Sequence, residues 1–348
     1  MISISLIEDK KAWEEFVLDY EENAGKLLGG IFLESWAWGQ FQKKLGKEIH
    51  RLGVYDGKRL VGISLLYLQK AKTGSFIYTP AGPIFLKWDK KLFTKWLEFT
   101  ASFAREKEAT FLRIEPKVVS TVAGKLLKEA GFVKAAAYTQ PKCTAVIDLT
   151  KTEAELLAEA SDSTRYNIRA SVRKGVSVRE GSSKEIQVFV NLLKETAQRK
   201  SLTLPIEKDY HKVQFDNLYR EGLMRLFIAE AEREALGAAL VLFYGNSAYY
   251  LHAANSLRKR QLRASYPLVW HCILESKKKG LKWFDFWGVS QTENPNDPWA
   301  GVTSFKLSFG AERVCFDSSY DLPLKSSYLL TKAVETWRKP IRKIFRFR

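Results

Sequence analysis

The sequence is poor in cysteine and contains no long apolar run. Its three cysteines are Cys143, Cys272 and Cys315, an odd number in 348 residues, and no two of them have the spacing of a metal-binding pair. This usage is typical of reduced thiols in a cytosolic compartment. No apolar segment approaches the roughly 18 residues of a transmembrane helix, and the start "MISISLIEDKK" lacks the basic region and long apolar core of a signal peptide. We therefore expect a cytoplasmic protein that is soluble or peripheral on the inner face of the membrane.

Several catalytic signatures are also missing. The four histidines show no HExxH or other ligand spacing, so no bound metal is expected. The sequence has no Walker loop, and it has no Gly-x-Ser-x-Gly elbow, which argues against a serine hydrolase.

The chain is rich in positive charge and in aromatic side chains. The formal net charge is +17, and 13% of the residues are aromatic within a hydrophobic share of 46%. The hydrophobic share is enough for packed cores, and the length favours two domains. The charge indicates polyanionic partners, namely nucleic acid, an anionic membrane surface or phosphorylated substrates, and a basic but inert surface is the alternative.

The last eleven residues, "RKPIRKIFRFR", concentrate this charge. Six of them are basic and none is acidic, and Ile341, Ile344, Phe345 and Phe347 are interleaved with the basic residues. This composition suits an anionic bilayer surface or RNA. A disordered basic end without a function is the alternative.

The chain contains an internal duplication. Arg51–Tyr67 and Arg225–Phe243 each consist of an apolar strand, a short polar turn and a second apolar strand, and Asp56-Gly57 is a strong hairpin signal. A helix and then a strand follow each hairpin. In the first copy the helix would bury Leu92, Trp96, Phe99 and Phe103 on one face, and the strand is "TFLRIEP". In the second copy "YPLVWHCILESKKKG" leads into "KWFDFWG", so the chain holds two α+β units of one kind.

The segment Gly301–Glu312, "GVTSFKLSFGAE", carries an isolated lysine. Phe305, Leu307 and Phe309 alternate with Lys306 and Ser308, and this period of two predicts a strand with one buried face. Lys306 would point away from the three apolar side chains. An isolated lysine in such a strand usually faces solvent.

The order of elements resembles the GNAT acyltransferase fold. The usual acetyl-CoA signature of that fold has glycines before the long helix, where backbone amides hold the pyrophosphate. The corresponding stretch here, "RQLRAS" at residues 260–265, has no glycine, and "PAGPIFLKWDK" in the first copy is not a CoA loop either. The fold therefore resembles an acyltransferase, while the usual acyl donor is not expected.

The sequence also resembles the FemABX family over nearly its whole length. The pieces that carry this resemblance are "SWAWGQFQKKLG", "PAGPI", "LRIEP", "STRYNIRASVRKGVSV", "YYLHAA", "FDFWGV" and "FKLSFG", in this order and spacing. The family consists of peptidyltransferases that move an amino acid from aminoacyl-tRNA to a peptidoglycan precursor. The resemblance implies an α+β fold of two tandem GNAT-like domains, each with a mixed, mostly antiparallel sheet flanked by helices. Sustained heptads are lacking, so we expect no coiled-coil arm.

The expected domain limits follow from the repeat. Residues 1–147 would form a first GNAT-like domain that binds the precursor, and residues 148–321 a second. Residues 322–348 would form a basic C-terminal helix and tail that pack back toward the first domain. The resemblance implies no cofactor, with aminoacyl-tRNA as co-substrate, and we expect a monomer.

The resemblance implies three catalytic residues. Lys306 matches the lysine of the family's Phe-Lys-x-x-Phe-Gly segment and would stabilise the negative charge that develops when the aminoacyl ester is attacked, and Phe305 would line the same site. Glu115 in "LRIEP" stands where the family usually has an aspartate near the acceptor amine, and glutamate is one methylene longer. An ordinary exposed carboxylate at a strand end is the alternative for Glu115.

A basic stripe is the first candidate for substrate binding. Thr152 and Glu155 form a capping box for a helix that could run to Lys174, and this helix would align Arg165 and Arg169 with Arg173. These arginines would contact phosphates of tRNA or of the precursor's diphosphate, and a solvated helix face is the alternative.

Further substrate-binding positions are implied by the family match. The family uses a lysine for the precursor's diphosphate near Gln42 and Lys43, which follow Trp38 on a helix, and the register between these two positions stays open. Tyr210 and Tyr250 match aromatic positions that line the family's substrate channel. A buried core tyrosine with a satisfied hydroxyl is the alternative for each.

The sequence as a whole predicts an aminoacyl-tRNA-dependent aminoacyltransferase that acts on an amine of the stem peptide of a UDP-linked or lipid-linked muropeptide precursor. The basic tail would add peripheral contact with an anionic membrane. One alternative is a GNAT-type N-acyltransferase that uses CoA or an acyl carrier protein. Another is a non-catalytic protein that binds RNA or membranes.

Overall fold

The computed structural model describes residues 1–24, 29–71, 74–117, 120–200, 209–316 and 319–337. Two compact units result: the first comprises Met1–Lys142 with the described part of residues 316–340, and the second comprises Cys143–Cys315. The limits differ from the predicted 147/148 and 321/322 because each unit takes a strand from across the expected boundary. The basic tail, residues 338–348, lies outside the described residues.

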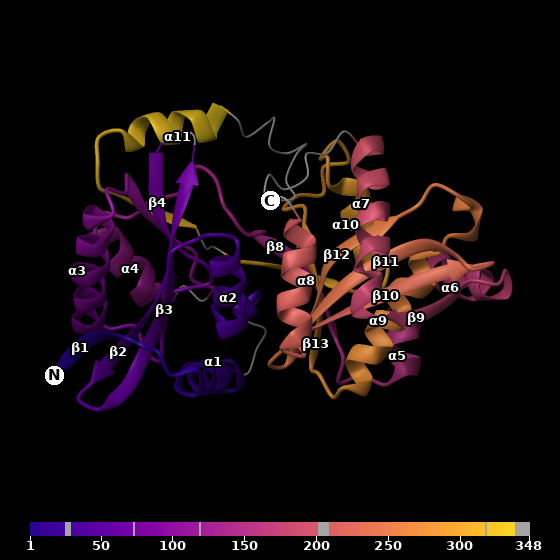
Figure 1. The fold of residues 1–348 in the computed structure, drawn as a ribbon, viewed down its shortest axis with the longest axis horizontal. Helices are drawn as coiled ribbons and strands as arrows, with labels where there is room; N and C mark the ends of the chain where they lie inside the picture. The colour runs from indigo at the N-terminus through magenta and orange to yellow at the C-terminus, as the bar shows by residue number, and fades with distance from the viewer. Residues whose placement is uncertain (25–28, 72–73, 118–119, 201–208, 317–318, 338–348) are drawn as a thin grey trace. The chain divides into compact units, whose positions relative to one another are not determined.

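The first unit is built around one mixed sheet (Figure 1). The strand order is β1 (Ile2–Leu6), β2 (Ile49–Asp56), β3 (Arg59–Ala71), β4 (Gly74–Thr79), β6 (Phe111–Ile114), β15 (Tyr320–Pro323) and β7 (Val133–Lys134), with β5 (Ile84–Phe85) paired to β3. The strands β4 and β6 pair in parallel, and the other described pairs are antiparallel. The helices are α1 (Lys10–Ala24), α2 (Trp36–Lys44), α3 (Lys90–Glu106), α4 (Thr121–Glu129) and α11 (Tyr328–Trp337).

Helix α3 covers one face of this sheet with its apolar side. Asp89 accepts a hydrogen bond from the backbone N–H of Leu92 and thereby caps the helix. Leu92 and Trp96 are buried as predicted, but Phe99 is 39% exposed. The buried stripe instead continues through Thr100 and Ala104, because a step of four residues keeps these positions on the face of Trp96.

The second unit repeats the architecture of the first. The strand order is β14 (Glu312–Cys315), β8 (Cys143–Asp148), β13 (Trp283–Val289), β12 (Ser247–Asn255), β11 (Glu234–Tyr244), β10 (Met224–Ala231) and β9 (Ser177–Gly181). Only the β12–β13 pair is parallel among the described pairs of this sheet. The helices are α5 (Glu153–Glu159), α6 (Asp162–Arg173), α7 (Ile186–Lys200), α8 (Tyr210–Arg220), α9 (Ser265–Lys278) and α10 (Ala300–Leu307).

The two predicted hairpins confirm the duplication. The β2–β3 hairpin turns at Gly57, whose φ is 59°, and the β10–β11 hairpin turns at Glu232 and Arg233, whose φ values are 53° and 63°. Each hairpin also contains a register shift close to its turn. In both units a long helix then connects the two strands of a parallel pair, β4 and β6 through α3 and β12 and β13 through α9, so the predicted tandem α+β fold with mixed sheets is confirmed.

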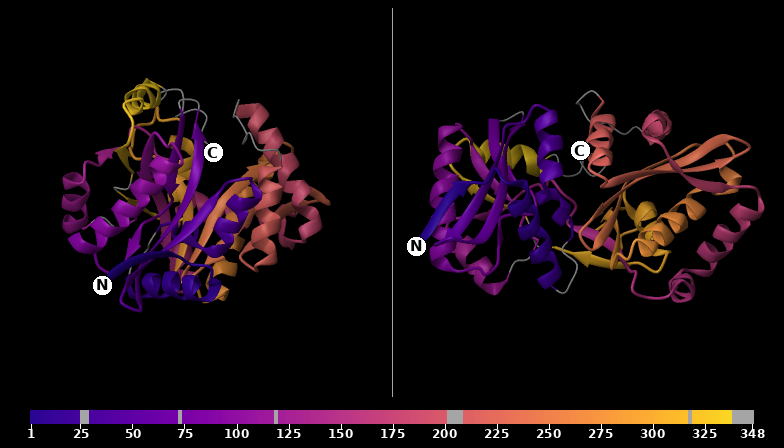
Figure 2. Two further views of the ribbon diagram at one scale, coloured as in Figure 1. Left: turned by 60° about the vertical axis from the view of Figure 1, so that its left-hand side comes forward. Right: turned by 60° about the horizontal axis from the view of Figure 1, so that its bottom comes forward.

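Helices cover both faces of the second sheet. Along β10, Phe227, Ala229 and Ala231 belong to a core cluster with residues of α9, whereas Leu226 and Ile228 are equally buried and point to the opposite face. Helices α7 and α8 lie on that opposite face, as the right-hand view of Figure 2 shows. Among the described residues, no helix is both long and apolar enough to cross a membrane.

Candidate active site

Lys306 lies on a helix and not on the predicted strand. Helix α10 contains Phe305 and Lys306, and the turn after it ends at Gly310, whose φ is 83°. The alternation of apolar residues was misleading because Phe305 and Phe309 are also four residues apart, which places them on one helical face. Their ring centroids are 5.3 Å apart, and both rings contact Tyr266.

A distortion of strand β13 forms the binding site of the Lys306 side chain. The pairing of β13 with β8 shifts register between Asp285 and Gly288, and Trp287 adopts a left-handed φ of 61°. The ammonium of Lys306 donates to the carbonyl of Gly288 at 2.7 Å and approaches that of Trp287 at 3.5 Å. The bulge therefore directs two consecutive carbonyls toward one lysine.

A buried carboxylate stabilises the bulge. Asp285 is fully buried and accepts hydrogen bonds from the backbone N–H of Trp287, at 2.6 Å, and from the hydroxyl of Thr144 on the neighbouring strand. Burial lowers the pKa of Lys306 to about 8, and the charge of Asp285 partly opposes this effect. Lys306 is consequently a cation that can release a proton near neutral pH.

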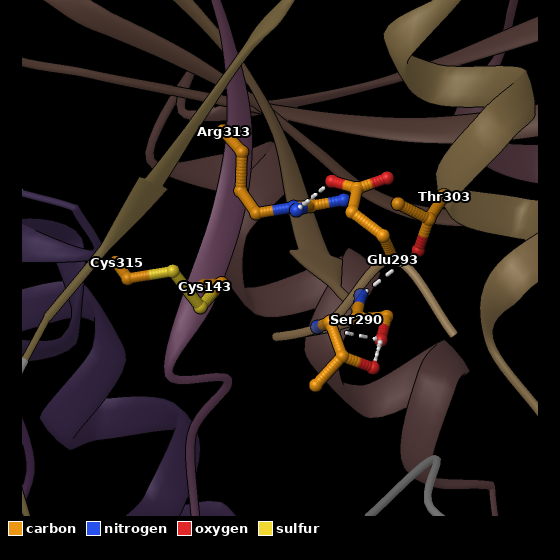
Figure 3. The surroundings of a disulfide bond; sticks show 7 residues. Cys143, Ser290, Glu293, Thr303, Arg313 and Cys315 are labelled. Atoms are coloured by element: carbon orange, nitrogen blue, oxygen red, sulfur yellow. Dashed lines mark hydrogen bonds and ion pairs between the residues drawn. A yellow bond between two sulfur atoms is a disulfide. The ribbon is translucent and has the colours of Figure 1, made fainter. Parts of the chain in front are cut away.

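A second contact attaches α10 to the end of β13. The backbone N–H of Ser290 donates to the hydroxyl of Thr303 at 2.8 Å, one helical turn before Lys306 (Figure 3). Arg313 on β14 pairs with Glu293 in the segment that connects β13 to α10. These contacts fix the position of the Lys306 backbone relative to the bulge.

The cysteines near this site are not all reduced thiols, contrary to the prediction. Cys143 and Cys315 form a disulfide and are direct cross-strand partners in β8 and β14, with Cα atoms 4.0 Å apart (Figure 3). They are 172 residues apart in the sequence, so no spacing rule could detect the pair. Cys272 is free and buried. Cys143 also pairs with Val289, the residue after Gly288, so the disulfide lies beside the bulge.

Two adjacent tyrosines of β12 have different surroundings. Tyr250, the predicted substrate-lining residue, contacts Phe284 and Phe286 in the core, and burial raises its pKa. Tyr249 points to the other face and contacts Trp287 at a centroid distance of 6.1 Å. Tyr249 is therefore the tyrosine next to the bulge. The pair "YY" gave no sign of which member would face the site, because β12 is buried on both faces.

The arginines of the predicted basic stripe lie on a shorter helix than expected. The capping box of Thr152 and Glu155 is present, but it begins α5, which ends at Glu159, and Ser161 caps the separate helix α6. The break lets Arg165 donate to the carbonyls of Ala158 and Ala160 and pair with Asp162. Arg165 is thus engaged at the end of α5.

Helix α6 connects the remaining arginines to the lysine-bearing helix. The hydroxyl of Thr164 bonds that of Ser308 at 2.8 Å, two residues after Lys306. Arg169 and Arg173 are exposed further along α6 and form no ion pair with the residues that the structure describes. Tyr210 begins α8 as predicted, and its ring contacts that of His211 at 5.2 Å.

In the first unit Glu115 is a buried hydrogen-bond acceptor and not an exposed carboxylate. It is 1% exposed at the end of β6. Its two oxygens accept bonds from the hydroxyl of Tyr78 at 2.5 Å, from the N–H groups of Thr139 and Gln140 at 2.7 and 3.2 Å, and from the hydroxyl of Ser319 at 3.2 Å. Burial and the neighbouring carboxylate raise the pKa of Tyr78, which keeps its hydroxyl a donor.

A chain of contacts leads from Glu115 toward α2. Tyr78 packs against Tyr67 at 5.4 Å, the ammonium of Lys47 lies 4.9 Å from the Tyr67 ring centroid, and Lys47 donates to Gln42 at 2.7 Å. Gln42 is buried, whereas the adjacent Lys43 is exposed. The first unit therefore brings Glu115 and Gln42 into one network, with Lys47 as a cation that the sequence argument did not single out.

Trp38 belongs to the packing of this region. It is buried between Phe32 and Phe41, with centroid distances of 5.2 and 5.1 Å. The Nε1 group of Trp38 has no hydrogen-bond partner among the described residues.

The motifs "PAGPI" and "LRIEP" meet at a small cavity in the same unit. The cavity is lined by Tyr20, Ile31, Ala81, Pro83, Ile84, Trp88, Pro116 and Lys117. Gly82 in the first motif lies against the buried carboxylate of Glu34, and a Cβ atom at Gly82 would clash with its Oε1. Only glycine fits this position, so Glu34 and Gly82 together fix the loop that forms the cavity wall.

The fold defines a class of two-domain protein in which each half has a GNAT-like sheet. The crystal structure of FemX has a TM-score of 0.81 with this chain, covering 96% of this chain and 100% of FemX at 18% identity. A tandem GNAT protein from the clavulanic acid biosynthesis pathway has a TM-score of 0.58 at 13% identity, covering 93% of this chain and 98% of its own.

Sequence comparison narrows this class to one family. The FemAB family model matches residues 19–130, 128–236 and 219–336, and the chain belongs to the FemAB family. Among its relatives are the lipid II:glycine glycyltransferases of Staphylococcus epidermidis and Staphylococcus aureus. Each is 20% identical to this chain, over 81% of the chain and 85% of the relative.

Proposed function

We propose that this protein transfers an amino acid to an amine on the stem peptide of a peptidoglycan precursor, in the formation of an interpeptide bridge. Membership of the FemAB family and the lysine held on the β13 bulge carry this proposal. The named activity of the staphylococcal relatives favours a lipid-linked acceptor over a soluble one. We propose aminoacyl-tRNA as the donor, because its ester is already activated and needs no nucleophilic side chain.

The proposed reaction balances without a covalent enzyme intermediate. The acceptor amine attacks the ester carbonyl, a C–N bond forms, and the carbonyl oxygen becomes an oxyanion. The C–O bond to the tRNA ribose then breaks, the amine loses a proton, and the ribose oxygen gains one. The charge that develops on oxygen is what a positioned cation stabilises.

Lys306 has the properties that this reaction needs. An ammonium group has three N–H donors, and two of them are directed to the carbonyls of Gly288 and Trp287. The third donor is available for the developing oxyanion or for the leaving ribose oxygen. A pKa of about 8 lets the same group deliver a proton to that oxygen at neutral pH.

Helix α6 provides a surface for the tRNA in this proposal. Arg169 and Arg173 lie one turn apart on its exposed side, and Tyr166, three residues before Arg169, is 63% exposed. Exposed arginines beside an aromatic ring suit a phosphate backbone and an unstacked base. We expect Arg169→Gln with Arg173→Gln to raise the KM for charged tRNA and to reduce the slope of log affinity against log salt by about 2. Arg220→Gln, at an exposed arginine on α8, is the matched control.

The proposal is tested by incubating the protein with a panel of charged tRNAs and lipid-linked precursor and measuring the product by mass spectrometry. The expected product is heavier by one amino-acid residue and appears only with charged tRNA. A product that forms from acyl-CoA and from no charged tRNA would overturn the choice of donor.

A further inference from the structure

Helix α11 presents a wholly apolar face to solvent. Leu329, Leu330 and Trp337 are 70%, 59% and 83% exposed, and Ala333 between them is also exposed. At about 100° per residue, these four positions fall within an arc of about 100°. Single exposed apolar residues are ordinary, but two leucines and a tryptophan on one arc of a short helix form a patch.

The opposite face of α11 is firmly attached to the first unit. Glu335 pairs with the buried guanidinium of Arg113 at 2.8 Å. The hydroxyl of Tyr328 donates to Asp321 at 3.0 Å, and its ring packs on Phe111 at 5.3 Å. These anchoring residues lie about 180° from the apolar arc. The helix therefore cannot rotate to bury Leu329 and Trp337 without breaking a buried ion pair.

The sequence that contains and follows α11 is strongly basic. The sequence from Leu324 to Arg348 contains a single acidic residue, Glu335, whose charge is already paired with Arg113. It contains eight basic residues: Lys325, Lys332, Arg338, Lys339, Arg342, Lys343, Arg346 and Arg348. A second copy of this chain on the same face would bring two such basic segments together, which is unfavourable.

We propose that α11 docks on an anionic lipid bilayer, with Leu329, Leu330 and Trp337 entering the interface between headgroups and acyl chains. An anionic bilayer has an apolar interior and a negative surface. It therefore complements both the apolar arc of α11 and the basic sequence that contains this helix. Tryptophan is favoured at this depth because its ring is amphipathic. The inference rests on the proposed function in one respect, since it places the enzyme where a lipid-linked acceptor lies.

The test compares vesicle binding of the full chain with that of the double variant Leu329→Ser, Leu330→Ser. Co-sedimentation uses vesicles of phosphatidylcholine alone and of phosphatidylcholine with phosphatidylglycerol. We expect binding to the anionic vesicles only, and at least a tenfold weaker partition for the double variant with unchanged thermal unfolding. Leu257→Ser, at a leucine that is 51% exposed on the second unit, is the control and should bind like the unchanged protein. Equal binding of the double variant would overturn the proposal.

Three further measurements test the bilayer against other occupants of this face. Brominated lipids should quench a tryptophan signal that Trp337→Phe removes, and the absence of such quenching would overturn insertion. A dimer in sedimentation velocity that the double variant abolishes would assign the face to a second copy instead. If deletion of residues 338–348 abolishes vesicle binding while the double variant binds like the unchanged protein, the tail and not α11 makes the contact, and the proposal fails.

The failure of this inference differs from the failure of the proposed function. Transfer to a soluble fragment of the precursor should be unchanged in the double variant, while transfer to precursor in anionic vesicles should fall with the binding. A protein that binds vesicles through α11 but transfers to neither acceptor would refute the function and leave the docking surface intact.

Discussion

The ammonium of Lys306 lies 2.7 Å from the carbonyl oxygen of Gly288, at a point where strand β13 has shifted its register by a bulge. The lysine and its acceptor come from different elements, α10 and β13, and both sides of the contact are fixed by further bonds. The geometry therefore belongs to the folded unit and not to a flexible side chain. Because the ammonium is held in a fixed position, a substitution that removes its charge tests the electrostatic role of Lys306.

Replacement of Lys306 by methionine should abolish most of the transfer activity. Methionine keeps the apolar stem and removes the charge, so we expect kcat/KM to fall about 10²- to 10³-fold, as for the loss of one oxyanion donor. Lys278→Met, at an exposed lysine of α9, is the matched control. Near-normal turnover in a variant with an unchanged circular dichroism spectrum would refute the role of Lys306.

The pKa of Lys306 sets the expected pH dependence. Its value of about 8 means that the ammonium is present below pH 8 and is lost above it, so kcat/KM should be level below pH 8 and fall about tenfold per pH unit above it. The residual activity of Lys306→Arg should lack this limb, because a guanidinium stays charged. An unchanged limb in that variant would assign it to another group.

The same shift affects stability with the opposite sign. The folded pKa lies below the ordinary value of 10.5, so the unfolded chain binds more protons between about pH 8 and pH 10.5. The contribution of Lys306 to the free energy of unfolding therefore rises with pH across this window. In urea unfolding at pH 7.5 and pH 9.5, the free energy of unfolding of the unchanged protein minus that of Lys306→Met should be larger at pH 9.5.

Glu115→Gln should destabilise the first unit. Four donors converge on the carboxylate, and an amide would place one of its own donors against them. We expect a loss of about 2–4 kcal/mol in the free energy of unfolding. Tyr78→Phe removes only one of these donors and should cost about 1–2 kcal/mol. If Glu115→Gln lowers activity with no loss of stability, Glu115 acts on the substrate and not as a structural acceptor.

The disulfide between Cys143 and Cys315 should be detectable without denaturation. Mass spectrometry after alkylation should show this pair protected from the reagent, and Cys272 unlabelled in the native protein because it is buried. Reduction should lower the stability of the second unit by about 2–5 kcal/mol. The double variant Cys143→Ala, Cys315→Ala should lose all sensitivity of its melting temperature to a reductant. Labelling of Cys315 in untreated protein would show that the pair is reduced.

Acetyl-CoA at millimolar concentration should leave the melting temperature unchanged. The loop before α9 has no glycine, and Lys259 and Arg263 occupy its left-handed positions, with φ values of 51° and 52°. A ligand that binds only the folded state must raise the melting temperature. A clear upward shift would restore a CoA-dependent acyltransferase as the best interpretation.

Much of the fold could be predicted from local patterns. The hairpin at Asp56-Gly57 has the turn chemistry and apolar strands that define it, and its counterpart in the second unit has apolar strands on either side of a short polar turn. The helix that carries Trp96 is equally clear from its spacing. The conformation of such elements is determined mainly by residues that are close together in the sequence.

The candidate site was only partly predictable because its geometry depends on contacts between distant segments. Lys306 was identified by its motif, but its helical conformation and its acceptors on β13 were not. The role of Tyr249 beside Trp287 depends on which face of a doubly buried strand meets the bulge. The Cys143–Cys315 pair depends on the pairing of β8 with β14, and the unit limits depend on the entry of β15 into the first sheet, and no local pattern records either.

The late position of β15 in the sequence has a consequence for synthesis on the ribosome. Strand β15, which fills the gap between β6 and β7, is translated after the whole second unit. Until it emerges, the N-terminal sheet has an open edge at β6, and Arg113 lacks both of its carboxylate partners, Asp321 and Glu335. An unpaired charge in that position opposes burial. The first unit therefore cannot complete its sheet until β15 has been synthesised. A fragment that ends at Lys142 should aggregate when it is produced alone.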